Sequence, residues 1–253
     1  EDKPEYEEVF EWETLNSMVP LWQRKKADVT REEYDKFYQE RFGDPAAPLS
    51  VITVSAEGAV TYKALLYIPS QAPSQYYTED YKPGLQLYAS GVMIMENCAD
   101  LLPDCFRFVR GVVDSADVSL NISRETLQEN VVLRKINQTI IKQTLSHLEK
   151  LAAKDAEKYA AFWKTFGRVL KEGPVEDPAN RGTLMKLMRF ASTKAGTGSE
   201  DVSLADYVAR MPKGQDKIYY LVATSRQTAE TSPYLEELKK KGCLLYTSPS
   251  PRD

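Results

Sequence analysis

The stretch that decides the fold spans residues 106–128 and reads FRFVRGVVDSADVSLNISRETLQ. Its second half predicts the start of a long helix, because Ser123 is a good N-cap and places Arg124 in the first turn. A cation there opposes the helix dipole, which favours anions at that end by about 0.3–1 kcal/mol. The free N–H groups of the same turn form an anion site, so an arginine beside them makes sense if a phosphate arrives from elsewhere.

Gln128 supports this interpretation, because it lies four residues after Arg124 on the same helical face. Arg124 would bring a fixed fork of donors to a terminal phosphate, and Gln128 a neutral amide. The pattern also fits a surface arginine with a mild dipole penalty. Taken alone, the pattern favours that simpler interpretation.

Helical periodicity continues beyond Ser123. One face of the predicted helix stays apolar over several turns through Leu127, Leu133, Ile136, Ile140, Leu145, Leu148 and Leu151. Further helices are predicted over residues 156–170, 184–190, 203–210 and 232–241. Another helix is expected to begin after Thr30, which has Glu33 three residues on, as in a capping box.

Strand patterns lie on both sides of these helices. Residues 49–55 and 60–68 are rich in β-branched and apolar residues around a turn, so they predict a hairpin. Residues 85–95 and 217–224 are further strand candidates, and 101–113 has mixed helical character. Strands flanking a central run of helices indicate an α/β protein.

Composition excludes several classes of protein. The 253 residues carry 33 Lys and Arg against 37 Asp and Glu, a net charge of −4, which argues against a nucleic-acid protein. No apolar run approaches the roughly 20 residues of a membrane span. Three cysteines and one histidine, His147, are too scattered for a zinc site, and their small number indicates a reducing compartment. His147 borders the apolar stripe and is interpreted as a boundary residue.

The two ends of the sequence have unusual composition. Residues 1–13 are strongly acidic and are interpreted as a solvated linker or edge segment. An opening at Glu1 rather than Met, with acidic residues, predicts no secretory signal peptide and suggests a fragment. Residues 244–253 end in Ser-Pro-Ser-Pro and resemble translated sequencing adapter, so we exclude them from the fold prediction.

The opening stretch resembles the signature of the 90-kDa heat-shock chaperone family, in its bacterial form. Other blocks of the sequence resemble the same family in the same order: residues 21–22, 29–34, 62–69, 171–173, 187–193, 206–211 and 218–220. Together they cover residues 12–243. Any one block is weak, but their order and density are specific.

The resemblance implies an α/β fold in three parts. Residues 1–153 would form a large α/β/α sandwich that carries the catalytic loop, and 154–188 a small helical coil. Residues 189–243 would form a second, smaller α/β/α unit, followed by the adapter-like tail at 244–253.

The resemblance also implies a function, as the middle segment of an ATP-dependent chaperone that binds unfolded or partly folded client proteins. Arg124 would reach the γ-phosphate of ATP, with Gln128 as its companion and Asn121 in the same catalytic loop. ATP and Mg would be held mainly by an N-terminal domain that also supplies the general base, so this segment alone is not expected to hydrolyse ATP. Other implied features are a homodimer formed through a C-terminal domain and a cytoplasmic location, without nucleic acid, membrane or bound metal.

Three positions need separate comment. Many family members carry an aromatic residue after Ala72-Pro73 that packs on the nucleotide domain, but here Ser74 stands there, with Tyr76 and Tyr77 just beyond. Several relatives carry basic residues where this chain has Ser90-Gly91, so no phosphate or client contact is carried over to that strand. Trp22 is either a core or hinge aromatic or, as in the family, an exposed contact for client protein.

Two alternatives of other classes remain at this point. One is the transducer domain of a related clamp ATPase that acts on DNA, of the topoisomerase II or mismatch-repair type. Such domains use lysine and carry basic surface, against which the net charge and Ser123-Arg124-Glu125 argue. The other is an interaction scaffold without enzymatic activity.

Overall fold

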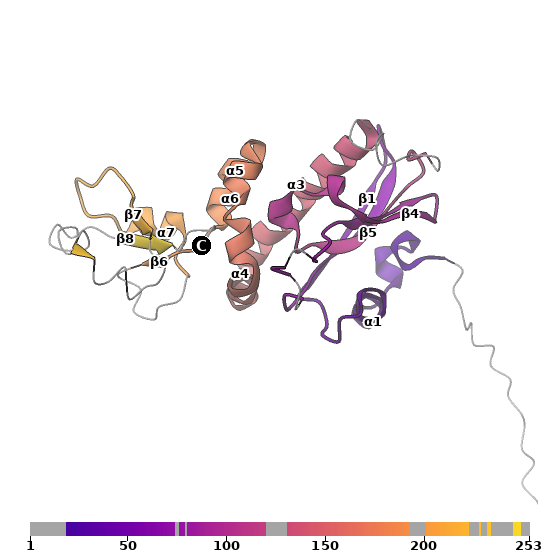
Figure 1. Cartoon of the computed structure of the whole chain (residues 1–253), viewed down its shortest axis with the longest axis horizontal. Helices are drawn as coiled ribbons and strands as arrows, with labels where there is room; N and C mark the ends of the chain where they lie inside the picture. The colour runs from indigo at the N-terminus through magenta and orange to yellow at the C-terminus, as the bar shows by residue number, and fades with distance from the viewer. Residues whose placement is uncertain are drawn as a thin grey trace, which may run out of the picture.

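The computed structural model describes residues 19–73, 76–78, 80–119, 131–192, 201–222, 228, 232–233 and 245–248. A large unit with a five-stranded sheet leads through a group of helices to a small three-stranded sheet (Figure 1). No helix within these residues is long and apolar enough to cross a membrane.

The large sheet contains five strands in the order β1-β2-β5-β3-β4. Their bounds are Ser50–Ala56 (β1), Tyr62–Ile68 (β2), Leu85–Ala89 (β3), Val92–Cys98 (β4) and Arg110–Ser115 (β5). Strands β3 and β5 are parallel, and the other neighbours are antiparallel. The predicted hairpin is confirmed as β1 and β2, whose register pairs Ser50 with Ile68.

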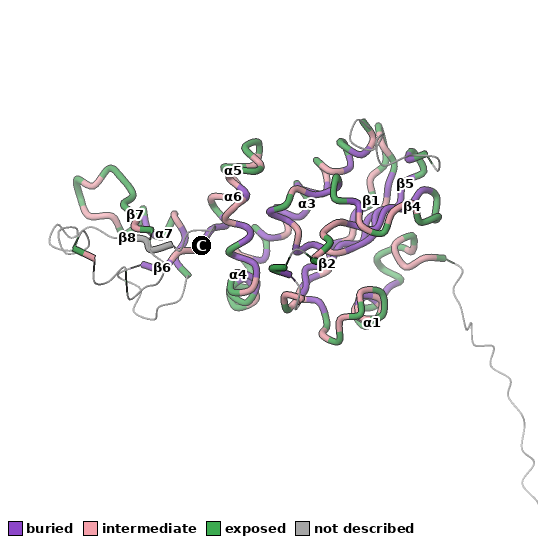
Figure 2. Tube along the Cα trace, viewed as in Figure 1, coloured by how far each residue is buried: buried purple, intermediate pink, exposed green. Residues whose placement is uncertain are grey.

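Helices cover both faces of this sheet. Along β2, Leu65 and Tyr67 pack in one cluster with helix α1 (Arg31–Phe42), whereas Leu66 and Ile68 join a second cluster with helix α3 (Val131–Lys154). This alternation follows from the two-residue period of a strand. The buried stretches on β2, β5 and α3 lie in the interior of the large unit (Figure 2). The layers make an α/β/α sandwich.

Helix α1 begins as predicted after Thr30. The Thr30 hydroxyl accepts a hydrogen bond from the Glu33 N–H at 3.2 Å, and the Glu33 carboxylate accepts one from the Thr30 N–H at 2.8 Å. The helix ends at Gly43, whose φ of 63° lies in the left-handed region. Two short 3-10 turns precede α1, η1 (Leu21–Gln23) and η2 (Lys26–Asp28).

Three helices follow α3. They are α4 (Ala156–Leu170), α5 (Gly173–Glu176) and α6 (Arg181–Leu187), with the turn η5 (Pro178–Asn180) between the last two. The prediction for 156–170 is confirmed, and the Asp155 side chain caps α4 by accepting from the Lys158 N–H at 3.0 Å. The predicted helix at 184–190 lies three residues too late, because Met188 is already extended and Phe190 pairs with Val202.

The small unit contains β6 (Ala191–Ser192), α7 (Leu204–Ala209), β7 (Tyr219–Val222) and β8 (Leu245–Ser248). The helix predicted over 203–210 is confirmed as α7, which Ser203 caps: its hydroxyl accepts from the Asp206 N–H at 3.1 Å. Strand β7 confirms the strand predicted at 217–224. Most of the helix predicted over 232–241 lies outside the described residues.

Three predictions are wrong. Residues 85–95 form two strands rather than one, because Ser90 and Gly91 take positive φ values of 49° and 82° and make a tight turn. Residues 101–113 are not mainly helical: after the turns η3 (Ala99–Leu101) and η4 (Asp104–Phe106) they enter β5. The exclusion of 244–253 from the fold fails for Leu245–Ser248, which form the central strand of the small sheet. The adapter origin of that tail and the subdomain boundaries stay predictions.

Candidate functional site

The predicted catalytic loop joins β5 to α3. Asn121, Arg124 and Gln128 fall outside the described residues, so their roles stay predictions. The chain leading into the loop is fixed by the β1–β2 turn: the Ser115 hydroxyl donates to the Thr61 carbonyl at 2.8 Å, and the Asp117 carboxylate accepts from the Thr61 N–H at 2.6 Å. Val118 is then buried in the main core.

The chain leaving the loop is fixed by α3. Leu133 and Ile136 are buried in the core between α3 and the sheet. The Asn137 amide donates to the Asp100 carbonyl at 3.0 Å, which ties the first described turns of α3 to η3. Both ends of the loop therefore depart from rigid, packed elements. Such a framework can hold a side chain at a constant position.

Trp22 lies half-buried against the sheet. Its indole N–H donates to Asp114 Oδ2 at 2.9 Å. Its ring packs on Tyr88, with ring centroids 5.0 Å apart, and on Phe37 at 6.0 Å. Trp22 thus has a packing role in the large unit, and contact with client protein stays a prediction.

Asp114 is a residue that the sequence reasoning missed. Its side chain is only 6% exposed and accepts three hydrogen bonds. Besides Trp22, the Gln23 amide donates to Oδ2 at 2.8 Å and the Gly91 N–H donates to Oδ1 at 3.0 Å. The one available signal was a carboxylate directly after the apolar pair Val112-Val113. Asp114 joins η1, the β3–β4 turn and the strand that leads into the predicted loop.

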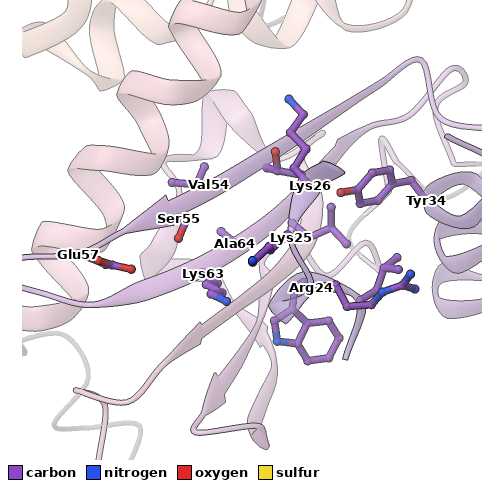
Figure 3. A pocket seen from close by; sticks show the side chains of 13 residues that line it. Arg24, Lys25, Lys26, Tyr34, Val54, Ser55, Glu57, Lys63 and Ala64 are labelled. Carbon is purple, nitrogen blue, oxygen red and sulfur yellow. The ribbon is translucent and has the colours of Figure 1, made fainter. Parts of the chain in front are cut away.

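A cavity of about 470 Å³ lies beside Trp22, between the η1–η2 segment and the β1–β2 hairpin (Figure 3). We call it the basic pocket, since four cations line it against one carboxylate: Arg24, Lys25, Lys26, Lys63 and Glu57. Arg24 pairs with Glu33 at 2.7 Å, and Lys63 donates to the Gln23 carbonyl at 2.8 Å. The excess of positive charge favours anionic groups in this pocket.

Comparison with known proteins decides the family. The family model described as "Hsp90 protein" matches residues 1–248. The chain belongs to the Hsp90 family. Chaperone protein HtpG of Shigella dysenteriae and of Escherichia coli are each 49% identical to it over 236 residues. These matches cover 93% of this chain and 38% of each relative, so the chain spans well under half the length of these proteins.

A solved structure supports the same family and fold. The middle domain of a Plasmodium falciparum heat shock protein superposes with a TM-score of 0.82 at 29% sequence identity. The match covers 92% of this chain and 91% of that domain. The chain is therefore an Hsp90 middle domain, and the predicted α/β fold class is confirmed. These matches do not favour a clamp ATPase that acts on DNA.

The structure separates the two tyrosines that follow Ser74 in this Hsp90-family chain, although Ser74 itself lies outside the described residues. Tyr76 is 2% exposed and packs against Tyr81 and Phe166 in the core. Burial raises the pKa of its phenol well above the usual range. Tyr77 is 58% exposed. Of the two, only Tyr77 is accessible to another domain.

Three carboxylates gather where the helices meet the large unit. Oxygens of Asp104, Glu172 and Glu176 lie within 4.8 Å of one another. Arg107 pairs with Asp104 at 3.1 Å and with Glu172 at 2.8 Å, while Glu176 accepts from the Cys105 N–H at 2.7 Å. These contacts account for the cluster and fasten α5 to η4.

Proposed function

We propose that this chain works as the middle segment of an ATP-dependent chaperone of the HtpG kind, and that its Arg124 contacts the γ-phosphate of ATP bound by a preceding domain. The observation that carries the proposal is the match to HtpG over 93% of the chain, together with the Hsp90 middle-domain fold. The anchored ends of the predicted loop support it, because a catalytic side chain must be held in place by a rigid part of the fold.

The residue types at 121–128 suit the phosphate end of a nucleotide. The Arg124 guanidinium and the Gln128 amide suit an anionic phosphate, and N–H groups at a helix start add partial positive charge. The domain that holds the adenine, the ribose and the magnesium ion would also hold the leaving group, ADP, and would supply the general base. ATP with Mg supplies the phosphoryl group whose negative charge Arg124 stabilises during transfer. Gln128 and Asn121 would help to orient the γ-phosphate beside Arg124. On this proposal the chain alone does not hydrolyse ATP.

The same proposal includes the partners of the whole chaperone. Client proteins would bind near Trp22, beside the basic pocket. The chain would work with its own N-terminal nucleotide-binding and C-terminal dimerisation domains, in a homodimer in the cytoplasm. Tyr77 would be the aromatic residue that packs on the nucleotide domain, since Tyr76 is occupied in the core.

The test uses the full-length chaperone that contains this chain. Arg124→Ala should leave ATP affinity nearly unchanged, since most of the nucleotide is held elsewhere. It should lower kcat by on the order of 10²–10³, because a cation aimed at developing phosphate charge acts mainly in the transition state. Steady-state hydrolysis at saturating ATP measures the effect.

Arg181→Ala is the matched control, because Arg181 is an exposed arginine in the first turn of a helix, the position predicted for Arg124. It should leave kcat unchanged. Wild-type turnover in Arg124→Ala, at full nucleotide occupancy and with the dimer intact, would show that Arg124 is a surface arginine without a role in hydrolysis.

A further inference from the structure

The basic pocket has positive charge that the described residues do not neutralise. Arg24 and Lys63 are engaged, with Glu33 and with the Gln23 carbonyl. Neither Lys25 nor Lys26 forms an ion pair with any carboxylate in the described ranges. Both lysines are exposed and line the pocket (Figure 3). A ligand with several negative charges would find partners there.

Part of the inner wall of the same pocket is apolar. Leu65 is a buried side chain of the hairpin on this face of the sheet, and the half-buried Leu21 and Trp22 complete the apolar part of the wall. A small inorganic anion would leave this wall without contacts. The chemistry of the pocket therefore suits an extended peptide that carries both carboxylates and large apolar side chains.

One segment of this chain has that composition. Residues 1–13 contain seven carboxylates, at Glu1, Asp2, Glu5, Glu7, Glu8, Glu11 and Glu13, with Lys3 as the single cation. Aromatic residues alternate with them at Tyr6, Phe10 and Trp12. Negative charge and aromatic rings in one short segment complement a basic rim and an apolar wall.

The segment is also within reach. The described chain begins at Val19, two residues before Leu21, which is itself part of the pocket wall. Five residues lie between Glu13 and Val19, and the six residue steps of an extended chain span at most about 20 Å. Because the segment is tethered beside the pocket, its effective concentration there is high and weak contacts suffice.

We propose that the acidic, aromatic segment 1–13 binds in the basic pocket of the same chain, with its carboxylates on Lys25, Lys26 and Lys63. Bound in this way, the segment fixes the direction in which a preceding domain is attached to the large sheet. It also covers the side of Trp22 that faces the pocket. The inference is independent of the role proposed for Arg124, since it involves neither ATP nor the loop at 120–130.

Carbodiimide cross-linking of the full 253-residue chain tests the contact directly. The reagent joins a carboxylate to a lysine amine without a spacer, so links form only where the two groups touch. Mass spectrometry should find links from residues 5–13 to Lys25, Lys26 or Lys63. Salt of about 0.5 M should reduce them, because it screens exposed charges. A mixture of isotope-labelled and unlabelled chains should show that the links lie within one chain.

A charge-reversal pair provides the second arm. In Lys25→Glu/Lys26→Glu, a Glu-specific protease should cleave within residues 1–13 about threefold to tenfold faster, since two ion pairs would be lost. Lys164→Glu/Lys186→Glu changes the net charge equally at two exposed lysines of the helical coil and should cleave at the wild-type rate. Circular dichroism checks that both variants fold.

Three outcomes overturn the proposal. They are an absence of links from residues 5–13, links found only between chains, and equal cleavage of the two charge-reversal variants. Links only between chains would assign the pocket to a second molecule. Loss of ATP turnover in Arg124→Ala would not affect any of these results.

Discussion

Asp114 is the best place to test how the large unit is held together. Its buried carboxylate accepts hydrogen bonds from Trp22, Gln23 and Gly91 at 2.8–3.0 Å. We expect Asp114→Ala to break the hydrogen bonds from the half-buried Trp22 N–H and from the backbone N–H of Gly91 in the tight turn, whereas the amide of the Gln23 side chain can turn to water. A hydrogen bond to a charged group contributes about 1.5–3 kcal/mol, so two lost bonds correspond to roughly 3–6 kcal/mol.

Part of that loss is offset, because the substitution also removes a charge that was costly to bury. The net decrease in the free energy of unfolding should therefore be about 2–4 kcal/mol. Trp22→Phe keeps an aromatic ring and removes only the N–H, so it should cost about 1–2 kcal/mol. In the double variant the two effects should overlap by about 1 kcal/mol, since both remove the same bond.

Chemical denaturation followed by far-ultraviolet circular dichroism measures these values without relying on Trp22 fluorescence. Asp28→Ala is the control, because Asp28 is exposed on the neighbouring turn η2 and should change stability by less than about 0.5 kcal/mol. The reasoning is refuted if Asp114→Ala resembles this control. It is also refuted if the effects of Trp22→Phe and Asp114→Ala simply add, since the indole would then not depend on the carboxylate.

Three further predictions concern the core and the titratable groups. Gly111→Ala should destabilise the chain by about 3 kcal/mol or more, because a Cβ there would lie 2.3 Å from the Leu65 carbonyl oxygen in the next strand; the denaturation midpoint measures this. Burial, followed by nearby lysines, lowers the pKa of His147, so the folded chain keeps this imidazole neutral while the unfolded chain takes up a proton below about pH 6.5. Stability should therefore fall between about pH 7.5 and 5.5, and His147→Gln should flatten that dependence in denaturation curves. Burial raises the pKa of the Cys98 thiol to about 11 and that of the Cys105 thiol further. Both thiols should therefore resist iodoacetamide in the folded chain and react after unfolding, as peptide mass spectrometry would show. Rapid labelling of the folded chain would contradict their burial.

The elements that the sequence predicts well are those determined by neighbours along the chain. The start of α1 depends on Thr30 and Glu33, and the start of α4 on Asp155 and Lys158, each pair three residues apart. Helix caps and apolar periodicity act within a turn or two, so they are visible in a linear sequence. The family resemblance, carried by ordered blocks of residues, predicted the class of fold in the same way.

Two of the errors lie where distant partners decide the structure. Residues 110–115 have no clear period, because the strand that they form is buried on both faces between β2 and β3. Leu245–Ser248 look like a poor strand until β6 and β7 pair with them on either side. A backbone that finds its hydrogen-bond partners in other strands can overrule its local propensity.

Around the candidate site, too, some features could be predicted from the sequence and others only from the tertiary structure. The sequence marked Trp22 as a residue of interest but left its role open between packing and client contact. Its partner Asp114 lies 92 residues away, and the basic pocket joins η1 and η2 to a hairpin some 30 residues further along the chain. The sequence by itself determined helices α1, α4 and α7, the Thr30 cap and the family. The tertiary structure alone decided the Asp114 contacts and the basic pocket, because folding brings these groups together from positions too far apart to interact along the chain.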